Sequence, residues 1–421
     1  MMRSMFAGVS GTRAHQVRMD VIGNNIANVN TVGYKYGRAT FQDMLSQTVR
    51  GSMAPTDNRG GVDPMQVGLG VMLRSIDIVF TPGNLESTGK TTDMAIQGNG
   101  FFVVRDSSGG LLFTRDGAFK IDAKGNLVHP STGYHVQGWK ADDVGDIDRA
   151  KPIEAIDVPL GTSMSAQPTS KISFVGNLDN SVVAPSPLPG PTDPWPADYS
   201  TSVPIYDSQG TQHTLVMEYR KTGTNEWRWT AMFGSGPPVG SGTVKFKTNG
   251  QFDPGDPPAP PPVISFNPGT GAAPLSITPD FSAITQVGDE SSVSWSTQNG
   301  YPAGSLETFN IDDRGIITGV YSNGQYKVLG QMVLASFANS EGLMRQSNNM
   351  YAETTNSGAP QLGEATKGGR GAVLGTTLEM SNVDLAREFT DMIVTQRGFQ
   401  ANSRVITAAD EMLQELLALK R

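Results

Sequence analysis

The chain has 421 residues, including 49 glycines, 27 prolines and no cysteine, and its formal net charge is −8 at pH 7. The lack of cysteine excludes disulfides, thiolate zinc sites, iron–sulfur clusters and a cysteine nucleophile. Only 17% of the residues are charged, so we expect no nucleic-acid partner, because that binding needs clustered Lys and Arg. The length allows two to three domains of about 150 residues each.

An amphipathic helix is predicted near the N-terminus. Met19, Ile22, Ile26 and Val29 recur at steps of three, four and three, which places them on one helix face. We expect this helix to end near Asn28–Gly33, because Asn tolerates and Gly favours the left-handed conformation that caps a helix. The Gly-rich connector at 51–70 completes a first segment of residues 1–70.

The N-terminus has neither a continuous apolar stretch nor a small-residue cleavage site, so it does not predict a cleaved signal peptide. The sequence contains no run of about 18 apolar residues, so we expect no membrane-spanning helix. If the protein leaves the cell, we therefore expect it to use a route that keeps its N-terminus.

The middle of the chain predicts antiparallel β structure. Apolar and polar residues alternate between turn signals such as Asp116-Gly117, Arg314-Gly315 and Asn323-Gly324, and strands do not alternate with helices. Two Pro-rich stretches, 181–200 and 254–262, predict exposed loops. We expect a middle β domain made of residues 71–145 and 286–359, with a second, outer β domain of residues 146–285 inserted into it.

The end of the chain predicts one long helix, from about residue 382 to 419, within a C-terminal segment of residues 360–421. Ser381 is a candidate N-cap, with Asp384 as its capping-box partner. The helix would be about 57 Å long at 1.5 Å per residue. Alternating steps of four and three predict a half-polar seam made of Leu385, Phe389, Met392, Gln396, Phe399, Ser403, Ile406, Asp410, Leu413 and Leu417.

Residues that could carry chemistry do not form a convincing set. His129 and His135 flank a turn and do not share a helix face, so we favour strand or surface histidines over a metal site. Trp227 and Trp229 alternate on one predicted strand, where packing into the sheet core is favoured over a sugar-stacking platform. We expect no catalytic residues, no metal, no cofactor and no small-molecule substrate.

The two terminal helices are the most informative feature, because each has an apolar stripe that it cannot bury alone. They could pair with each other as a stalk on a monomer. Alternatively, they could pair and also pack against other copies, and the length and half-polar seam of the second helix favour this arrangement. Contacts of that kind that do not close into a ring build a helical tube.

Both ends of the chain resemble bacterial flagellar rod and hook proteins. The stretch NNIANVNTVGYK at 24–35 is similar to the N-terminal signature of this family, and GTTLEMSNVDLAREFTDMIVTQR at 375–397 is similar to its C-terminal signature. The segments TPGNLESTGKTTDMAIQGNGFFVV, TRDGAFKIDAKGNLV and VLGQMVLASFAN also resemble the β domain that the distal rod and the hook share. The large inserted segment favours a hook protein over a distal rod protein.

The resemblance implies a mixed, mainly β fold, with two antiparallel β domains, one inserted in the other, and paired long N- and C-terminal α-helices. It implies a structural subunit, not an enzyme, that self-assembles into a curved, flexible tube. That tube acts as a universal joint and transmits torque from the basal-body rod to the filament. Cross-linking through cysteine, which occurs in some hooks, is excluded here because the chain has none.

The resemblance also implies where the protein works and what it contacts. We expect an extracellular location in the flagellar hook, reached through the flagellar export apparatus without a cleaved signal peptide. The expected partners are further copies of the chain and the distal rod, hook cap and hook–filament junction proteins. We expect the assembly interface on the terminal helices to contain Met19, Ile22, Asn25, Ile26, Asn28, Val29, Asn30, Leu385, Phe389, Met392, Gln396, Phe399, Ile406, Leu413 and Leu417.

Two alternatives stay open. One is a distal rod subunit of the same family. The other is a secreted β-rich module with a helical stalk that binds glycans or other ligands through Trp195, Trp227, Trp229 and Trp295.

Overall fold

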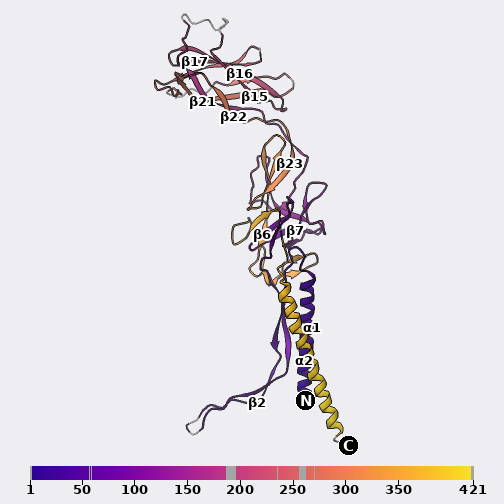
Figure 1. Cartoon of the computed structure of the whole chain (residues 1–421). Helices are drawn as coiled ribbons and strands as arrows, with labels where there is room; N and C mark the ends of the chain where they lie inside the picture. Colours follow the sequence, from indigo (N-terminus) through magenta and orange to yellow (C-terminus); the bar gives the residue numbers. More distant parts are fainter. Residues whose placement is uncertain are drawn as a thin grey trace. The chain divides into compact units, whose positions relative to one another are not determined.

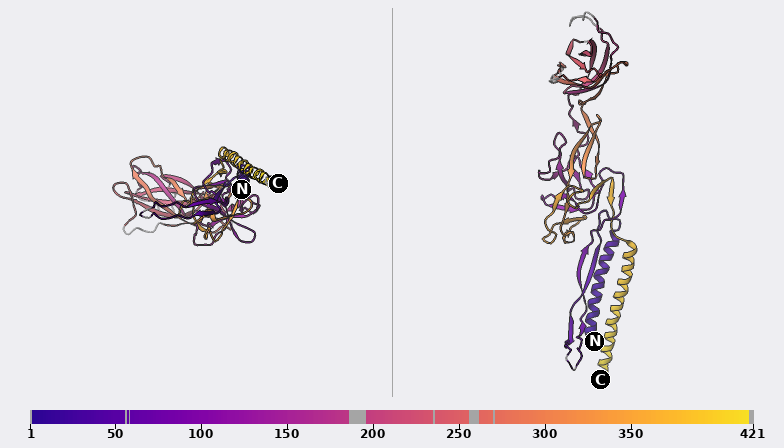
Figure 2. Two further views of the ribbon diagram at one scale, coloured as in Figure 1. Left: turned by 90° about the horizontal axis from the view of Figure 1, so that it is seen from below. Right: turned by 90° about the vertical axis from the view of Figure 1, so that its left-hand side faces the viewer.

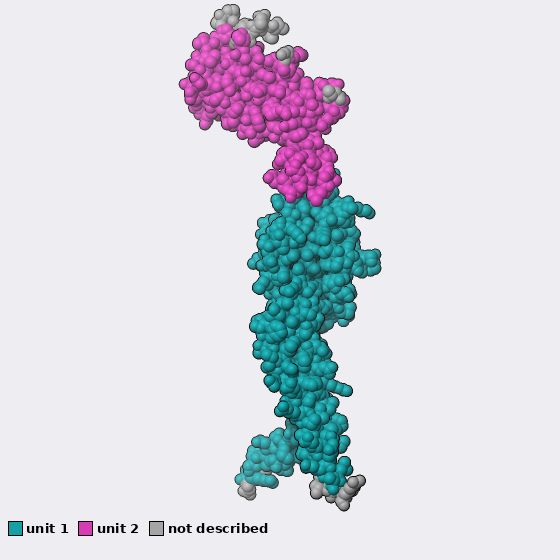
Figure 3. Space-filling model, turned by 45° about the vertical axis from the view of Figure 1, so that its right-hand side comes forward, with its two compact units in different colours: residues 1–159, 309–319, 327–421 teal, residues 160–308, 320–326 magenta. Residues whose placement is uncertain are grey.

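The computed structural model describes residues 2–55, 57, 59–185, 196–234, 236–255, 262–269 and 271–418. The chain forms two compact units, which Figure 3 colours separately. Unit 1 comprises Met1–Pro159, Phe309–Gly319 and Lys327–Arg421, and unit 2 comprises Leu160–Thr308 and Val320–Tyr326. Unit 2 thus begins and ends later in the chain than the insert of residues 146–285 that the sequence predicts.

Unit 1 contains both α-helices of the described chain. Helix α1 (Met2–Ala27) and helix α2 (Leu385–Ala418) lie side by side and run in opposite directions (Figures 1 and 2). The chain turns after α1, where Gly33 adopts a φ of 68°. A Cβ at Gly33 would lie 2.6 Å from the Asp116 backbone nitrogen, so the turn requires glycine for its backbone conformation and for space.

The start of α2 differs from the prediction, because its N-cap is Asp384 and not Ser381. One carboxylate oxygen of Asp384 accepts hydrogen bonds from the backbone N–H groups of Ala386 (3.0 Å) and Arg387 (3.3 Å). The residues before it are held in extended form by Asn382, which accepts from the Tyr36 N–H and donates to the carbonyls of Val79 and Thr81. Because of these bonds, α2 begins about one turn later in the chain than the sequence predicts.

The strands of unit 1 form several small sheets and part of a larger sheet of 14 strands. The small pairs are all antiparallel: β1 (Gly37–Asp43) with β4 (Val71–Ile78), β2 (Ser46–Arg50) with β3 (Met65–Gly68), β5 (Leu85–Ser87) with β31 (Thr377–Glu379), and β6 (Met94–Gln97) with β30 (Ala372–Gly375). The β1–β4 pair runs along α1 (Figures 1 and 2).

The strands of the larger sheet that lie wholly in unit 1 are β7 (Phe101–Arg105), β8 (Leu111–Thr114), β9 (Lys120–Ile121), β10 (Leu127–Val128), β11 (His135–Lys140), β12 (Glu154–Ala155), β26 (Leu334–Ser336), β27 (Met344–Arg345), β28 (Met350–Ala352) and β29 (Gln361–Gly363). A 3₁₀ turn, η1 (Ser340–Gly342), precedes β27. Three further strands contain residues of both units: β23 (Gly304–Ile311), β24 (Ile316–Tyr321) and β25 (Tyr326–Met332). The core of unit 1 contains the buried side chains Phe101, Val103, Phe113, Trp139, Val333, Ala335, Leu343 and Tyr351.

Many of the tight turns share an Asp-x-x-Gly pattern. In the turns that begin at Asp106, Asp122 and Asp142, one carboxylate oxygen accepts backbone N–H bonds from the residues two and four positions later, at 2.7 to 3.0 Å. The glycine of each turn has a positive φ. The same pattern recurs at Asp207 and Asp312. Because the aspartate and the glycine are both local, these turns fold from short-range sequence.

Unit 2 contains two packed sheets. One has the order β15 (Tyr199–Tyr206), β16 (Gln212–Gly223), β17 (Glu226–Phe233), β18 (Pro238–Phe246) and β19 (Phe252–Asp253). The other has the order β20 (Ile264–Phe266), β21 (Leu275–Val287), β14 (Lys171–Asp179) and β22 (Ser294–Gln298). A short strand, β13 (Ser163–Met164), pairs with β23.

The mainly β fold with terminal helices is confirmed, with one departure from antiparallel pairing. Strands β14 and β21 are parallel, from Lys171 opposite Thr278 to Asp179 opposite Val287. A parallel pair needs a long crossover connection. Here the whole five-stranded sheet lies between the two strands in sequence and supplies that connection.

The tryptophans of unit 2 belong to its core. Trp227 and Trp229 have no exposed surface, and Trp229 lies 5.5 Å from Phe281 between ring centroids. Trp295 is 39% exposed, and Trp195 lies outside the described residues. The surface sugar platform that Trp227 and Trp229 could have formed is therefore absent from the described chain, because their rings fill the space between the sheets.

We expect the Asp-x-x-Gly turns to make the protein sensitive to acid. A hydrogen bond from the Asp146 backbone N–H lowers the pKa of Asp142, and side-chain hydrogen bonds lower the pKa of Asp106 and Asp122. A lowered carboxyl pKa stabilises the fold above the unfolded pKa of about 4, and this contribution is lost as the pH falls through the folded value. Between pH 4 and pH 2, the free energy of unfolding should therefore fall less in Asp142→Asn than in the unsubstituted chain.

This pH dependence can be measured by urea unfolding followed by far-UV circular dichroism. Asn keeps a side-chain oxygen that can accept the same N–H bonds, so the turn should persist. Equal slopes of stability against pH in the two proteins would contradict the expectation.

Candidate assembly interface on the terminal helices

The residues that follow α1 form a hydrogen-bonded turn. The Asn24 side-chain amide donates to the Tyr34 hydroxyl at 3.0 Å, and the Asn28 amide donates to the Asn24 carbonyl at 2.8 Å. The Thr31 hydroxyl donates to the Asn28 side-chain oxygen at 3.1 Å. These local bonds satisfy the carbonyl end of the helix and reverse the chain direction.

Asn25 links this turn to the start of α2 and to β1. Its side-chain oxygen accepts from the Gly37 N–H at 2.9 Å and from the Tyr34 hydroxyl at 3.2 Å. Its amide donates to the Gly37 carbonyl at 2.9 Å and to the Glu388 carboxylate at 3.3 Å. Burial raises the pKa of Glu388, and the hydrogen bond from Asn25 opposes that rise. Asn25 is only 1% exposed, so the structure places it within the chain and away from any surface.

A buried charge cluster holds both helices to the β structure of unit 1. Glu379, on β31, has one carboxylate oxygen 2.5 Å from the Lys35 ammonium and the other 3.3 Å from the Arg115 guanidinium. The Gly83 N–H also donates to Glu379, and the Lys35 ammonium donates to the Thr81 carbonyl at 2.8 Å. All three charged side chains are at most 2% exposed. Burial lowers the pKa of Lys35, and Glu379 opposes that shift.

The face of α1 that meets α2 consists mostly of small residues. A Cβ at Gly11 would lie 2.7 Å from the Asn402 side chain, and a Cβ at Gly8 would lie 3.0 Å from Ile406. On α2, a Cβ at Gly398 would lie 2.6 Å from the His15 ring. The helices therefore approach closely, and a side chain at any of these positions would force Asn402, Ile406 or His15 to move.

Polar groups accompany these glycines along the contact between the helices. Arg18 donates to Asp391 at 3.0 Å in an ion pair between the helices. Glu388 and Thr395 on α2 are buried, and the Thr395 hydroxyl bonds back to the Asp391 carbonyl. The helix pair is therefore held by close packing, hydrogen bonds and one ion pair more than by large apolar side chains.

The apolar seam predicted on α2 lies beside this contact face. With 3.6 residues per turn, the centre of the seam is about a fifth of a turn from the face that meets α1. Leu385, Phe389, Phe399 and Leu417 remain 40%, 50%, 36% and 69% exposed, and Gln396 is exposed as well. Met392, Ile406 and Leu413 are partly buried.

The predicted residues on α1 are more enclosed. Ile22 is 4% exposed and lies beside Arg18, Glu388 and Asp391. Met19, Ile26, Asn28 and Val29 are partly buried, whereas Asn30 is exposed. The structure thus brings Ile22 and Asn25 to α2, and it leaves Asn30 at the surface.

A second apolar flank of α2 was missed by the seam prediction. Val394, Val405 and Met412 are 56%, 44% and 47% exposed, and they lie on the other side of the face that meets α1. Ile393, at 58%, adds to the first flank. A search for one stripe with steps of four and three cannot find two flanks. The sequence does contain a pattern that indicates this arrangement. Gly8, Gly11 and Ala14 lie on one face of α1, and their side chains are too small to form an apolar core with α2.

The β2–β3 hairpin is a further apolar surface that the sequence reasoning did not identify. All residues of both strands are exposed, including Val49, Met65 and Val67 at 55%, 50% and 42%. Leu45, which precedes β2, is 65% exposed. Apolar exposure of this extent on adjoining elements is typical of surfaces through which proteins contact other chains.

The described residues contain no group of three or more His, Asp or Glu side chains placed to bind a metal ion. His129 is buried, and its ring lies 3.3 Å from Asp116 and within hydrogen-bond distance of Ser131 and Thr132. A helix long and apolar enough to span a membrane does not occur in the described part of the chain.

Four flagellar family models match the chain in order. They are described as flagella basal body rod protein (residues 5–35), flagellar hook protein FlgE/F/G D1 domain (95–173), flagellar basal body protein FlaE D2 domain (177–301) and flagellar basal body rod FlgEFG protein C-terminal (375–419). The chain is 41% identical to the flagellar hook protein FlgE of Borreliella burgdorferi over all of both chains. It is 36% identical to that of Salmonella typhimurium, over 99% of this chain and 100% of the relative.

The chain belongs to the flagellar hook protein family. It is accordingly a structural subunit of the hook that self-polymerises within the flagellar axial structure, which confirms the resemblance seen in the two terminal signatures. The family is structural, in line with the expectation of a protein without enzymatic activity. The solved structure of the Helicobacter pylori flagellar hook protein FlgE2 matches with a TM-score of 0.52 at 16% identity, over 71% of this chain and all of that one. This match shows a common fold.

We expect a larger residue at Gly398 to loosen the helix pair of this hook-family subunit. Gly398→Leu would push against the His15 ring, and overpacking of this kind costs about 1–3 kcal/mol. The matched control is Gly23→Leu in α1, because a Cβ at Gly23 meets no atom within 4 Å. Limited proteolysis of the monomer should release the ends of Gly398→Leu faster than those of the control. Equal rates would show that the helices do not depend on close approach at Gly398.

We also expect Glu379→Gln to destabilise unit 1 strongly. The substitution leaves the Lys35 and Arg115 charges buried without a counter-charge, which typically costs about 3–5 kcal/mol. Glu86→Gln on the paired strand β5 is the control, because Glu86 is exposed. In thermal unfolding, the midpoint temperature should fall strongly for Glu379→Gln and stay nearly unchanged for Glu86→Gln. Similar midpoints for the two variants would refute the role of the cluster.

Proposed function

We propose that the chain builds the curved hook tube by packing the apolar flanks of α2 against neighbouring copies. One observation carries this proposal. The α1–α2 contact uses glycines, hydrogen bonds and an ion pair. In contrast, the apolar side chains of Phe389, Ile393 and Val394 on α2 remain 50%, 58% and 56% exposed. A monomeric stalk would be expected to turn such side chains inward, because each exposed apolar side chain forgoes hydrophobic stabilisation.

The two apolar flanks of α2 suit a helix with neighbours on both sides. In a tube, each subunit has a copy on either side, and contacts that do not close generate a helical assembly. We therefore place the paired helices at the inner wall of the tube, with the β units outside them. In this arrangement the inner contacts hold while the outer contacts slide as the tube bends and transmits torque from the rod to the filament.

The assembly interface that we propose is the predicted set on α2, extended by Ile393, Val394, Val405 and Met412. Of the predicted residues in and after α1, Ile22 and Asn25 serve the subunit's own helix pair and Asn28 bonds within the turn after α1. The other four, Met19, Ile26, Val29 and Asn30, remain candidates for contact with other copies. We further propose contacts with the distal rod, hook cap and hook–filament junction proteins, and an extracellular location reached through the flagellar export apparatus. We propose no enzymatic activity.

We expect a charge on the first flank of α2 to abolish tube formation without unfolding the β units. Phe389→Asp and Phe399→Asp would each place a carboxylate in an interface that becomes dry on assembly, which costs several kcal/mol. The matched control is Val144→Asp, because Val144 is 89% exposed on the β structure of unit 1. Electron microscopy should show tubes from the unsubstituted chain and from Val144→Asp, but none from the two Phe variants.

Circular dichroism and the melting of each variant separate a failure of assembly from a failure of folding. Tubes of normal length from both Phe variants would refute packing through the first flank. The absence of tubes from the unsubstituted chain, under conditions where seeds are present, would count against self-assembly itself.

A further inference from the structure

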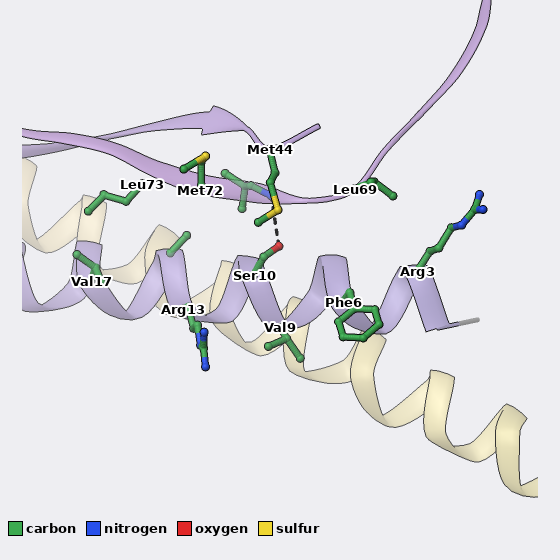
Figure 4. Close-up of a pocket in the computed structure, with 12 residues that line it drawn as sticks. Arg3, Phe6, Val9, Ser10, Arg13, Val17, Met44, Leu69, Met72 and Leu73 are labelled. Carbon is green, nitrogen blue, oxygen red and sulfur yellow. Dashed lines mark hydrogen bonds between the residues drawn. The ribbon is translucent and has the colours of Figure 1, made fainter. Parts of the chain in front are cut away.

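An apolar groove of about 560 Å³ runs along α1 on a side that α2 does not cover (Figure 4). It is lined by Phe6, Val9 and Val17 from the helix and by Met44, Met72 and Leu73 from β4 and the chain after β1. Phe6, Met44 and Met72 are 59%, 45% and 41% exposed. The groove therefore presents a row of apolar side chains to solvent on an element that already belongs to the proposed assembly region.

The helix α1 turns different faces to α2 and to the groove. Gly8 and Gly11 face α2, whereas Phe6 and Val17 lie about two-fifths of a turn away on average and face the groove. Ser10 joins the helix to the strands, because its hydroxyl accepts from the Val71 N–H at 3.3 Å (Figure 4). The subunit's own α2 is therefore directed elsewhere and does not fill the groove.

The last part of α2, residues 405–418, has the shape and chemistry to fill it. Val405 and Met412 form an exposed apolar edge, Glu415 lies next to Met412 three residues later, and Glu411 lies one turn before Glu415. The groove is lined from Arg3 to Val17 of α1, a rise of about 21 Å. The 14 residues of this helix end also span about 21 Å.

The charges of the two surfaces are opposite. The first 19 residues of the chain contain Arg3, Arg13, His15 and Arg18 and no acidic residue. Residues 405–418 contain Asp410, Glu411 and Glu415 and no basic residue. Arg3 and Arg13 line the groove. Within the described ranges, neither they nor Glu411 and Glu415 have an ion-pair partner, whereas Arg18 is already paired with Asp391.

We propose that the α1 groove of one copy binds residues 405–418 of α2 from a second copy, with Met412 in the groove and Glu411 and Glu415 next to Arg3 and Arg13. The inference rests on the proposed function and adds to it which residues of the two copies face each other in one contact. The two surfaces are different, so the contact is heterologous and propagates as a helical array instead of closing as a dimer. The positive charge of the groove attracts the negative charge of residues 405–418, which favours this pairing. Two copies of residues 405–418 would repel each other, which disfavours packing of these segments on one another.

The lack of cysteine makes a direct test possible. Copies carrying Met72→Cys and copies carrying Met412→Cys are purified separately, mixed, assembled into tubes and oxidised. Because each copy carries one thiol, a disulfide between a Met72→Cys chain and a Met412→Cys chain must join two molecules. We expect this mixed dimer on a non-reducing gel, identified by mass spectrometry of the joined peptides.

The control replaces Met412→Cys with Val394→Cys. Val394 is an exposed residue on the same side of α2, 18 residues or about five turns earlier. We expect little cross-linking of Met72→Cys with Val394→Cys. Efficient cross-linking at Val394, with none at Met412, would overturn the proposed register.

A charge exchange supplies an independent test without thiols. Arg13→Glu and Glu415→Arg alone should each raise the concentration needed for tube growth several-fold, and the double variant should recover most of that loss. Failure of the double variant to recover, although both single variants weaken assembly, would contradict the pairing.

The outcomes separate this inference from the proposed function. Tubes that form normally from the cysteine variants but give no mixed dimer at Met412 would overturn the groove contact and leave self-assembly intact. In that case another segment, such as the β2–β3 hairpin of a neighbour or a different protein, covers the groove. Failure of the unsubstituted chain to form tubes would instead count against the proposed function.

Discussion

The buried carboxylate of Glu379 is the point on which the arrangement of the helices depends. Lys35 lies eight residues after the end of α1, and Glu379 lies six residues before the start of α2. Their ion pair therefore closes a loop of more than 300 residues at the place where both helices leave the β structure. Arg115, from the turn after β8, pairs with the same carboxylate and ties that place to the core strands of unit 1. The cost of burying these charges is offset only while all three are present with their hydrogen bonds.

With the helix bases held in this way, the rest of α1 and α2 does not need a large apolar core to stay together. Glycines and the Arg18–Asp391 pair bring the helices into close contact, and Asn25 connects them to β1. The large apolar side chains of α2 are then free to face outward on both flanks. Each half-exposed side chain of the size of Phe or Ile contributes about 1 kcal/mol when a neighbour covers it. In the proposed assembly, several such contacts repeated around a tube would hold copies together without a single strong site.

Local features of the sequence were sufficient for much of the fold. The end of α1, the Asp-x-x-Gly turns and the β strands around them follow from residues close together in the chain, because Asn, Asp and Gly set the backbone where they stand. The start of α2 and the parallel pairing of β14 with β21 depend on contacts with distant residues, such as Asn382 with Val79 and Thr81, that no local pattern contains. The seam prediction on α2 found one apolar stripe and assigned it to the assembly interface. Gly8, Gly11 and Gly398 form the face of closest approach between the two helices, and which face that is depends on contacts between segments almost 400 residues apart in the chain.

The contacts inside the subunit and the contacts proposed between subunits differ in kind, and the difference suits a tube that bends. Hydrogen bonds and buried ion pairs weaken steeply with small changes in distance and angle, so the network of Asn25, Lys35 and Glu379 keeps the helix bases in one geometry. Apolar contacts are non-directional and depend on the area covered, so an α2 flank can shift against the surface of a neighbouring copy that covers it and keep most of its stabilisation. In the proposed assembly, each revolution would therefore be absorbed between subunits and not within them. Met412 in its groove would limit how far that shift goes, because the long, flexible Arg and Glu side chains beside it keep an ion pair over a wider range of positions.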